Sequence, residues 1–392
     1  MIDKITIETK EEINTKEFFN QLIQLANENS FSLAIWRYPN TNTFSAVFSF
    51  ESSTERKLDL QTNVGFALAP FFSSECNAHF IHADIVIHEK ENGLDIIGSS
   101  ECRNRLVNLL KNKAKPKLKD TVAEDLVVVS KNNFITCLND AIEAINDGKF
   151  KKVVIGRRKK IELSESFQIV NSLYEMSNTY PFAFISYVSC HKLGKWIGAT
   201  PEVLLSIKDK RHFKTVSLAG TQLAKAEQTK NAVWTQKEIE EQALVTRYII
   251  DCFKKIRLRE YEDIGPRTIK AGNLFHLCTD FFVDMEEVNF PDLGNVMLEL
   301  LHPTSAVCGM PKHASEEFIK KYEGFDRELY SGYLGPINID NNTHLAVNLR
   351  CAKLQQNTAT LFAGVGITAD SEPEKEWLET EMKFETIRKA LT

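Results

Sequence analysis

Paired glutamates occur at two places in the chain, at a spacing that suits metal binding. Glu238 and Glu241 are three residues apart, as are Glu376 and Glu379 near the C-terminus. On a helix, side chains three residues apart project from the same face. Four carboxylates gathered in a dry site repel one another unless a cation neutralises them, and oxygen-only ligands favour a hard ion such as Mg²⁺. The alternative is that each pair belongs to a solvated helix face.

Four further ionisable residues stand in apolar, strand-like surroundings. They are Lys152 before a Val-Val-Ile run, Glu202 after Pro201, His276 between Phe and Leu, and Arg350 at the end of an alternating apolar run. Such side chains are rarely buried without a partner or a function. Each one alone also fits an edge strand or a satisfied core group. Together they supply a base, an acid and a cation that can bind an anionic group.

The composition excludes several classes of protein. The chain has 392 residues, 43% of them hydrophobic and 26% charged, and a net charge of −5. Because there is no basic excess, neither nucleic acid nor a membrane is expected as a partner. The motifs HExxH, GxSxG and GxxxxGK[ST] are absent. Their absence argues against metalloprotease, hydrolase and nucleotide-binding functions.

The cysteines and the N-terminal residues predict a cytoplasmic protein. The eight cysteines are scattered without a CxxC pair, which is typical of buried thiols in a reducing compartment. The N-terminal residues lack the apolar core of a signal peptide, and no run of eighteen apolar residues occurs.

Residues 1–125 carry no chemical motif. We expect them to form a variable N-terminal part of one fold, and residues 126–392 to form its catalytic region. Asn14 and Glu17 have the capping-box spacing that starts a helix. The predicted elements are a helix up to Asn29, a hairpin over 31–50 and strands over 64–72 and 81–87. Alternating lysines over 111–119 predict a solvated connection, with a basic binding patch as the alternative.

The second part of the chain shows strands in runs rather than in regular alternation with helices. The predicted strands cover 152–157, 182–189, 196–207, 214–222, 273–283, 344–354 and 358–368, and the predicted helices cover 134–145, 234–256, 313–322 and 372–391. This order favours an α+β fold of large antiparallel sheets with helices packed outside, rather than a parallel α/β fold.

Residues 134–390 resemble the chorismate-utilising enzymes. This family includes isochorismate synthases, salicylate synthases and the large subunits of anthranilate and aminodeoxychorismate synthases. The matching stretches, in the family order, are KVVIGR, GATPEVLL, SLAGTQ, KEIEEQ, LLHPTSAVCGMPK, FDRELYSGYLGPI, NLRCAKL, LFAGVGI and EWLETEMK. The resemblance implies one α+β domain whose antiparallel sheets pack face to face around the site.

The resemblance implies a Mg²⁺ site and a pocket for chorismate. Glu241 and Glu379 would bind Mg²⁺, with Glu238 and Glu376 in support, and the ion would hold the ring carboxylate. Lys383 would lie near that carboxylate, although a salt bridge to Glu379 is equally open. The residues implied in binding the rest of the substrate are Arg350, Tyr330 and Gly364 at the enolpyruvyl carboxylate, His276 beside the ring, and Gly220, Thr221 and Ala306 in the pocket wall.

Lys152 and Glu202 take the two chemical roles that the resemblance implies. Lys152 would deprotonate the water that attacks C2 of chorismate, and Glu202 would protonate the hydroxyl that leaves C4. An acid that works near pH 7 needs a pKa two or three units above the usual value of about 4.3 for glutamate, and burial acts in that direction.

Lys152 also favours one branch of the family. Ammonia-using members usually carry Gln at this position, so an isochorismate synthase is expected. The alternatives are a salicylate synthase, which shares the lysine, an aminodeoxychorismate or anthranilate synthase component, and a catalytically inactive homologue. The family precedent favours a monomer, and both menaquinone and siderophore biosynthesis are open as pathways. Gln242 and Phe275 depart from residues common in relatives, but neither replaces a proposed ligand or proton carrier.

Overall fold

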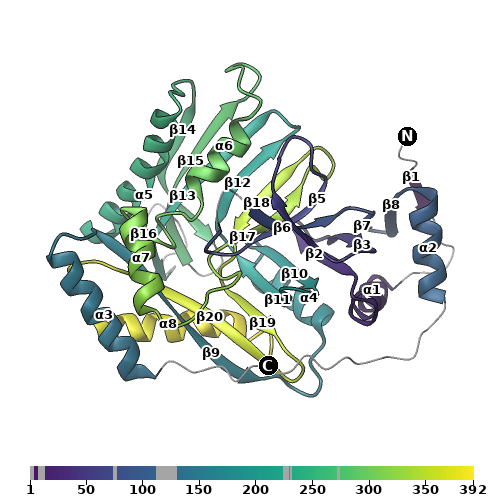
Figure 1. Cartoon of the computed structure of the whole chain (residues 1–392), viewed down its shortest axis with the longest axis horizontal. Coiled ribbons are helices and arrows are strands. Elements are labelled where there is room, and N and C mark those ends of the chain that lie inside the picture. The colour runs from purple at the N-terminus through teal and green to yellow at the C-terminus, as the bar shows by residue number, and fades with distance from the viewer. Residues whose placement is uncertain are drawn as a thin grey trace.

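Two large antiparallel β-sheets form the framework of the protein (Figure 1). The computed structural model describes residues 4–7, 14–73, 77–111, 130–223, 229, 232–271 and 274–392, with only the backbone at 4–7, 221, 223, 237, 271 and 274. The eleven-stranded sheet has the order β1 (Lys4–Ile7), β8 (Gly93–Gly98), β7 (Ile85–Lys90), β3 (Ser45–Ser49), β2 (Ser32–Arg37), β10 (Phe184–Cys190), β11 (Gly194–Thr200), β19 (Cys351–Leu354), β20 (Thr358–Ile367), β9 (Lys152–Glu162) and β16 (Gly309–Met310). The nine-stranded sheet has the order β14 (Glu262–Ala271), β15 (Leu274–Asp284), β13 (His212–Leu223), β12 (Val203–Lys208), β18 (Thr343–Val347), β17 (Tyr333–Ile337), β5 (Gly65–Ala69), β6 (Asn77–His82) and β4 (Thr54–Lys57). The helices are α1 (Thr15–Asn29), α2 (Ser100–Lys111), α3 (Lys131–Asn146), α4 (Ile169–Thr179), α5 (Gln236–Lys255), α6 (Leu293–Leu301), α7 (Lys312–Tyr322) and α8 (Pro373–Arg388).

Apolar side chains from both sheets fill the space between them. Trp36 of β2 meets Phe66 of β5 with ring centroids 5.5 Å apart, inside a buried cluster drawn from the two sheets. Successive residues of a strand point to opposite faces. Leu33 and Ile35 of β2 therefore pack on the other face, in a cluster with residues of α1 and α4. The sheets pack face to face, as predicted.

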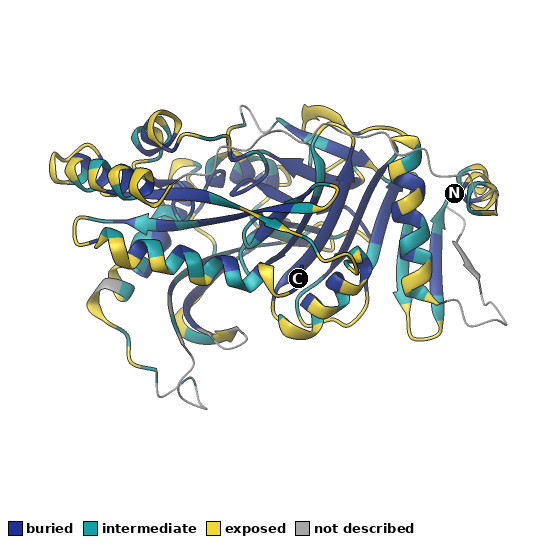
Figure 2. Cartoon of the chain, turned by 90° about the horizontal axis from the view of Figure 1, so that it is seen from below, coloured by how far each residue is buried: buried dark blue, intermediate teal, exposed yellow. Residues whose placement is uncertain are grey.

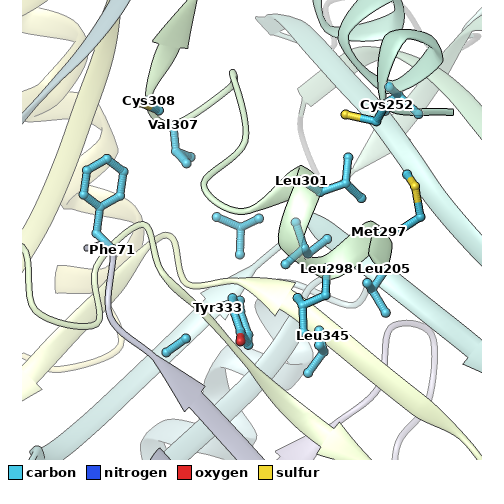
Figure 3. Close-up of a cluster of buried hydrophobic side chains, with 14 of the residues drawn as sticks. Phe71, Leu205, Cys252, Met297, Leu298, Leu301, Val307, Cys308, Tyr333 and Leu345 are labelled. Atoms are coloured by element: carbon cyan, nitrogen blue, oxygen red, sulfur yellow. The ribbon is translucent and has the colours of Figure 1, made fainter. Parts of the chain in front are cut away.

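Helices cover the outer faces of both sheets. Met297, Leu298 and Leu301 of α6 pack with Leu205 of β12 and Leu345 of β18 (Figure 3). In Figure 2 the strands are mostly buried and the outward faces of the helices are exposed. This arrangement confirms the predicted α+β class. None of the described helices combines the length and apolar character that a membrane crossing requires.

Residues 1–125 contribute strands to both sheets. β2 pairs with β10 in the eleven-stranded sheet, and β5 pairs with β17 in the nine-stranded sheet. Neither sheet is therefore built from one part of the chain alone. The expected boundary near residue 125 and the lysine-rich stretch after Lys111 lie outside the described residues.

Most predicted elements are present, and the exceptions have physical causes. Asn14 caps α1 by accepting a hydrogen bond from the Glu17 amide at 3.3 Å. The predicted strand over 81–87 is wrong, because this run contains the end of β6, a turn and the start of β7. β14 was not predicted, since it contains Pro266 and largely exposed side chains.

Two predicted strands, 196–207 and 344–354, are each divided between the two sheets. β11 ends at Thr200 and β12 begins at Val203 in the other sheet. Pro201, which has no amide hydrogen for strand pairing, lies at this break. The second run divides into β18 and β19, and Arg350 lies between them with φ 47°. Glu202 and Arg350 therefore lie where the chain passes between sheets, and placing Arg350 in a strand was wrong.

A buried ion pair joins β9 to the loop after α6. Arg327 is fully buried and donates hydrogen bonds to both carboxylate oxygens of Glu323. The same guanidinium donates to the carbonyls of Val154 at 2.7 Å and Val307 at 2.9 Å. Glu323 in turn accepts the Gly156 amide at 2.7 Å. Removing one partner of such a pair leaves a buried charge without compensation.

We therefore expect Arg327→Met to lower the free energy of unfolding by about 3 to 5 kcal/mol. Urea denaturation followed by circular dichroism measures this change. The matched control is Arg388→Met, which removes a half-exposed arginine paired with Glu385 at 2.7 Å and should lower the free energy of unfolding far less. Equal losses in the two variants would show that the buried pair does not anchor β9.

Candidate active site

Lys152 lies beside β20 at the start of β9. Its side chain is buried, and Nζ donates a hydrogen bond to Glu241 Oε1 of α5 at 2.8 Å. Gly366 lies opposite Val154 on the paired strand. A Cβ atom at Gly366 would come within 2.9 Å of Lys152 Cε. Because Gly366 has no side chain, the Lys152 side chain can occupy the space beside it.

Glu202 is a carboxyl group held largely away from water. Burial raises the pKa of Glu202 to about 7, although Lys152, Arg350 and Lys383 are close enough to oppose that rise. A group with this pKa is partly protonated at neutral pH. It has the protonation state that a general acid requires.

His276 lies on β15 next to the bulge of β13. Its Nδ1 is 3.2 Å from the carbonyl oxygen of Gly220, which has φ +69°. Burial, assisted by Arg350, lowers the pKa of His276 to about 4, so the imidazole is neutral at pH 7. Thr221 is the register partner of His276, but its side chain lies outside the described part of the chain.

Tyr330 packs tightly against two glycines of the paired strands β9 and β20. A Cβ atom would come within 2.5 Å of the Tyr330 hydroxyl at Gly364 and within 3.1 Å of the ring at Gly156. The Tyr330 ring also stacks on Phe362, with centroids 5.4 Å apart. Burial raises the pKa of Tyr330, so its phenol stays neutral. A neutral hydroxyl in this place can donate a hydrogen bond to an anion.

Arg350 is a half-buried cation that forms no ion pair with a carboxylate among the described residues. Burial lowers its pKa, and the nearby Tyr180 and Glu202 partly offset this effect. Its carbonyl oxygen accepts the Ala199 amide at 3.1 Å, which fixes the backbone. A guanidinium held in this way can bind a carboxylate in a planar, two-point arrangement.

Two of the four candidate metal ligands are paired with lysines. Glu241 is bonded to Lys152, and Glu379 lies 2.8 Å from Lys383. The salt bridge between Lys383 and Glu379, which was the alternative to a role near the ring carboxylate, is therefore present. Lys383 Nζ also donates a hydrogen bond to the Gly364 carbonyl at 2.8 Å. Each carboxylate already neutralises a positive charge. The oxygen-only donor set suits a hard cation such as Mg²⁺.

The other two candidate ligands are placed differently. Glu238 caps α5, accepting the Thr235 amide at 2.8 Å in a reciprocal capping box. Glu376 is buried on the inner face of α8. In the described part of the chain, no three His, Cys, Asp or Glu side chains lie close enough together to hold a metal ion by themselves. Mg²⁺ is usually bound by only one or two carboxylates, with water and substrate as its other ligands. In each glutamate pair, one residue therefore binds a lysine. The other residue caps a helix in the case of Glu238 and is buried in the case of Glu376.

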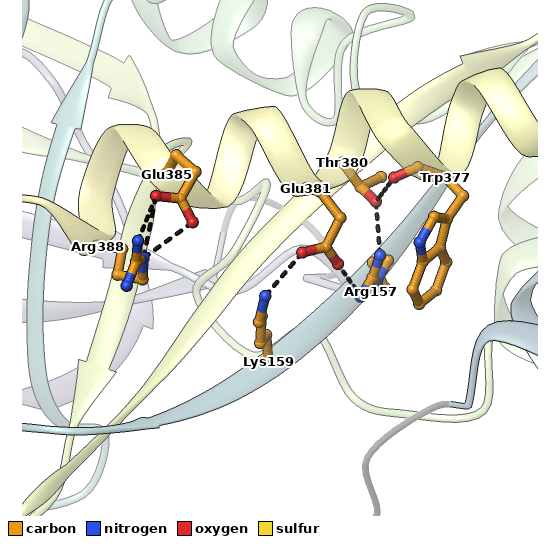
Figure 4. A network of polar contacts seen from close by, with 7 residues as sticks. All are labelled: Arg157, Lys159, Trp377, Thr380, Glu381, Glu385 and Arg388. Atoms are coloured by element: carbon orange, nitrogen blue, oxygen red, sulfur yellow. Dashed lines mark hydrogen bonds and ion pairs between the residues drawn. The ribbon is translucent and has the colours of Figure 1, made fainter.

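Sequence reasoning missed the contacts that hold α8 in place. Arg157 of β9 donates hydrogen bonds to Thr380 at 2.8 Å and Glu381 at 2.7 Å, and its guanidinium lies 3.4 Å from the centre of the Trp377 ring (Figure 4). Lys159 donates to the other oxygen of Glu381 at 2.7 Å. Strand periodicity was the available signal, since Arg157 and Lys152 fall on opposite faces of β9.

The loop between α6 and β16 adds Ala306 to the site. Ala306 and Glu202 line one small cavity. The loop is fixed by a turn in which the Thr304 carbonyl accepts the amides of Val307 at 3.1 Å and Cys308 at 2.9 Å.

Comparison with known proteins identifies the family. A family model described as chorismate binding enzyme matches residues 3–392. The chain is 31% identical to isochorismate synthase EntC of Escherichia coli K12 over 242 residues, which are 60% of this chain and 61% of that protein. It is 28% identical to isochorismate synthase DhbC of Bacillus subtilis over 270 residues, 65% of this chain and 66% of that protein. The match therefore spans about three fifths of the length of EntC.

Solved structures share the fold. The structure of MenF, the menaquinone-specific isochorismate synthase from Escherichia coli, aligns with a TM-score of 0.76 at 19% identity, covering 100% of this chain and 94% of that one. Anthranilate synthase component I from Streptococcus pneumoniae aligns with a TM-score of 0.66 at 18% identity, covering 86% and 82%. Together with the family model, which matches nearly the whole chain, these findings show that the protein belongs to the chorismate binding enzyme family.

Proposed function

We propose that this protein is an isochorismate synthase that converts chorismate to isochorismate. The observation that carries the proposal is the placement of Glu202, a carboxyl group with a pKa of about 7, beside the buried amine of Lys152. The named isochorismate synthases among its relatives support the same activity. A lysine at this position also favours water over ammonia as the nucleophile.

The charges around Glu202 suit a substrate that carries two carboxylates. Arg350 and the neutral hydroxyl of Tyr330 bind the enolpyruvyl carboxylate of chorismate, next to the backbone of Gly364. Lys383 lies on the side of the ring carboxylate. Neutral His276 flanks the ring without adding a further positive charge. Binding the dianion supplies the counter-charge that Arg350 lacks within the described part of the protein.

The reaction needs one proton acceptor and one proton donor. The amine of Lys152 takes a proton from water as its oxygen bonds to C2. The carboxyl of Glu202 gives a proton to the C4 hydroxyl, which leaves as water while the ring double bonds shift. One water enters and one leaves, so the product is an isomer of the substrate. Each turnover ends with Lys152 protonated and Glu202 ionised, and proton return resets both groups.

Mg²⁺ is the cofactor that the donor set fits. Glu241 and Glu379 would hold it, with Glu376 and Glu238 behind them. When bound, the ion supplies positive charge for the ring carboxylate of chorismate. Glu241, which accepts a hydrogen bond from Lys152 in this structure, would instead hold the ion, and Lys152 would act as the base toward water.

Product analysis tests the proposed activity. Purified protein incubated with chorismate and Mg²⁺, without ammonia, should form isochorismate, which chromatography separates from other products. Salicylate together with pyruvate would instead place the protein with the salicylate synthases. A requirement for ammonia before any product forms would contradict the role given to Lys152.

We expect Lys152→Ala to lower kcat by at least about 100-fold, because no other base replaces the lysine. Chorismate binding measured by calorimetry should be retained. The control is Lys353→Ala, which removes a lysine of β19 that is paired with Glu328, and it should leave kcat unchanged. Retained turnover in Lys152→Ala would remove the lysine from the base role.

The proposed acid predicts a pH dependence. Activity requires protonated Glu202, so kcat/KM should fall as the pH rises through about 7, the pKa of this group. Rates measured between pH 5.5 and 9 would show this limb. Its persistence at the same pH in an active Glu202→Gln variant would assign it to another group.

Metal removal tests the cofactor. EDTA should stop the reaction and added Mg²⁺ should restore it, because the ring carboxylate then loses and regains its counter-ion. Calorimetry should also detect Mg²⁺ binding in the presence of chorismate, and Glu379→Gln should weaken it. Full activity in EDTA would contradict the proposed metal site.

A further inference from the structure

A small cavity of about 10 Å³ lies beside Glu202, on the side of the nine-stranded sheet that α5 covers. It is bounded by β12, β13, α5 and the loop after α6, and its lining includes Glu202, Thr215, Tyr248, Thr304 and Ala306. This volume is close to the smallest that holds one water molecule. A water in such a place also needs two to four polar partners.

The hydroxyl groups that line the cavity differ in whether they have a hydrogen-bond partner. Thr215 donates a hydrogen bond to the Leu204 carbonyl at 2.7 Å, and Tyr248 donates to the Leu300 carbonyl at 2.6 Å. The buried hydroxyl of Thr304 has no hydrogen-bond partner of normal geometry among the described residues. Leaving a buried hydroxyl without a hydrogen-bond partner is unfavourable. Thr304 therefore has a donor available for a group inside the cavity.

We propose that Thr304 is a positioning residue for Glu202, and that one water in the cavity completes the hydrogen bonds between the Thr304 hydroxyl and the carboxyl group. The catalytic part of this inference rests on the proposed function, in which Glu202 is the acid. Fixing one carboxyl oxygen on the cavity side directs the other, with its proton, toward the substrate. The turn that binds the amides of Val307 and Cys308 holds the Thr304 backbone in place.

The electrostatics agree with this geometry. Thr304 favours the ionised form of Glu202 and so acts against the effect of burial on its pKa. The charged groups that face Glu202 from other elements are Lys152 on β9, Arg350 before β19 and Lys383 on α8. None of them lines the cavity. Removing the hydroxyl therefore changes one contact of the carboxyl group and leaves these three cations in place.

The test compares Thr304→Val, which keeps the side-chain shape, with Thr304→Ser, which keeps the hydroxyl. Ser305→Ala is the matched control, because Ser305 has a buried hydroxyl in the same loop without a partner among the described residues and does not line the cavity. The readout is the infrared band of the protonated Glu202 carboxyl, isolated by subtracting the spectrum of the same protein with Glu202→Gln and followed against pH.

Thr304→Val should raise the titration midpoint of this band by about one pH unit, as expected when a hydrogen bond to a carboxylate is lost. Thr304→Ser should restore the midpoint, and Ser305→Ala should leave it unchanged. The basic limb of kcat/KM should move upward by the same amount in Thr304→Val, with kcat reduced about tenfold.

An unchanged midpoint in Thr304→Val, or equal shifts in Thr304→Val and Ser305→Ala, would overturn the inference. The infrared titration needs no substrate, so it separates this failure from a failure of the proposed function. If the midpoint shifts but no isochorismate forms, the contact between Thr304 and Glu202 stands and its catalytic use is overturned.

Discussion

The geometry of the site depends on two neighbouring places where the chain passes from one sheet to the other. One crossing joins β11 to β12 and carries Glu202, and the other joins β18 to β19 and carries Arg350. Hydrogen bonds tie them together: the Thr200 hydroxyl donates to the Val347 carbonyl at 2.6 Å, and the Val347 amide donates to the Glu202 carbonyl at 2.9 Å. Because strand pairing in both sheets fixes each crossing, an acid and a cation are held beside each other without relying on a mobile loop.

The same burial gives the two groups their chemical character. Glu202 holds a proton near neutral pH because its carboxylate is poorly solvated, even with three cations nearby. Arg350 forms no ion pair with a carboxylate among the described residues. The buried pair of Arg327 and Glu323 fixes β9 and the loop of Ala306 around these groups, while Arg157 fixes α8. The surrounding core therefore holds in position an acid that keeps its proton near neutral pH and a cation that has no ion pair among the described residues.

Sequence periodicity predicted the antiparallel sheets, most of the longer elements and the ionisable residues in apolar runs. It did not predict the crossings, because an apolar run that passes between two sheets looks like one long strand. Pro201 was the one local signal of the first crossing, and nothing in the residues around Arg350 marks the second. The glutamate pairs were identified by spacing, but their ion pairs with Lys152 and Lys383 depend on contacts between distant segments. The role of Gly366 also became visible only once Lys152 was placed beside it.

In the proposed reaction, a proton acceptor on β9 and a proton donor at the first crossing exchange one water for another at the substrate ring. The most direct test is to run the reaction in ¹⁸O-labelled water and analyse the product by mass spectrometry. One ¹⁸O atom in the C2 hydroxyl of isochorismate is the predicted result. Isochorismate that carries no label would contradict the account, since the hydroxyl would then have moved within the substrate without water as the nucleophile.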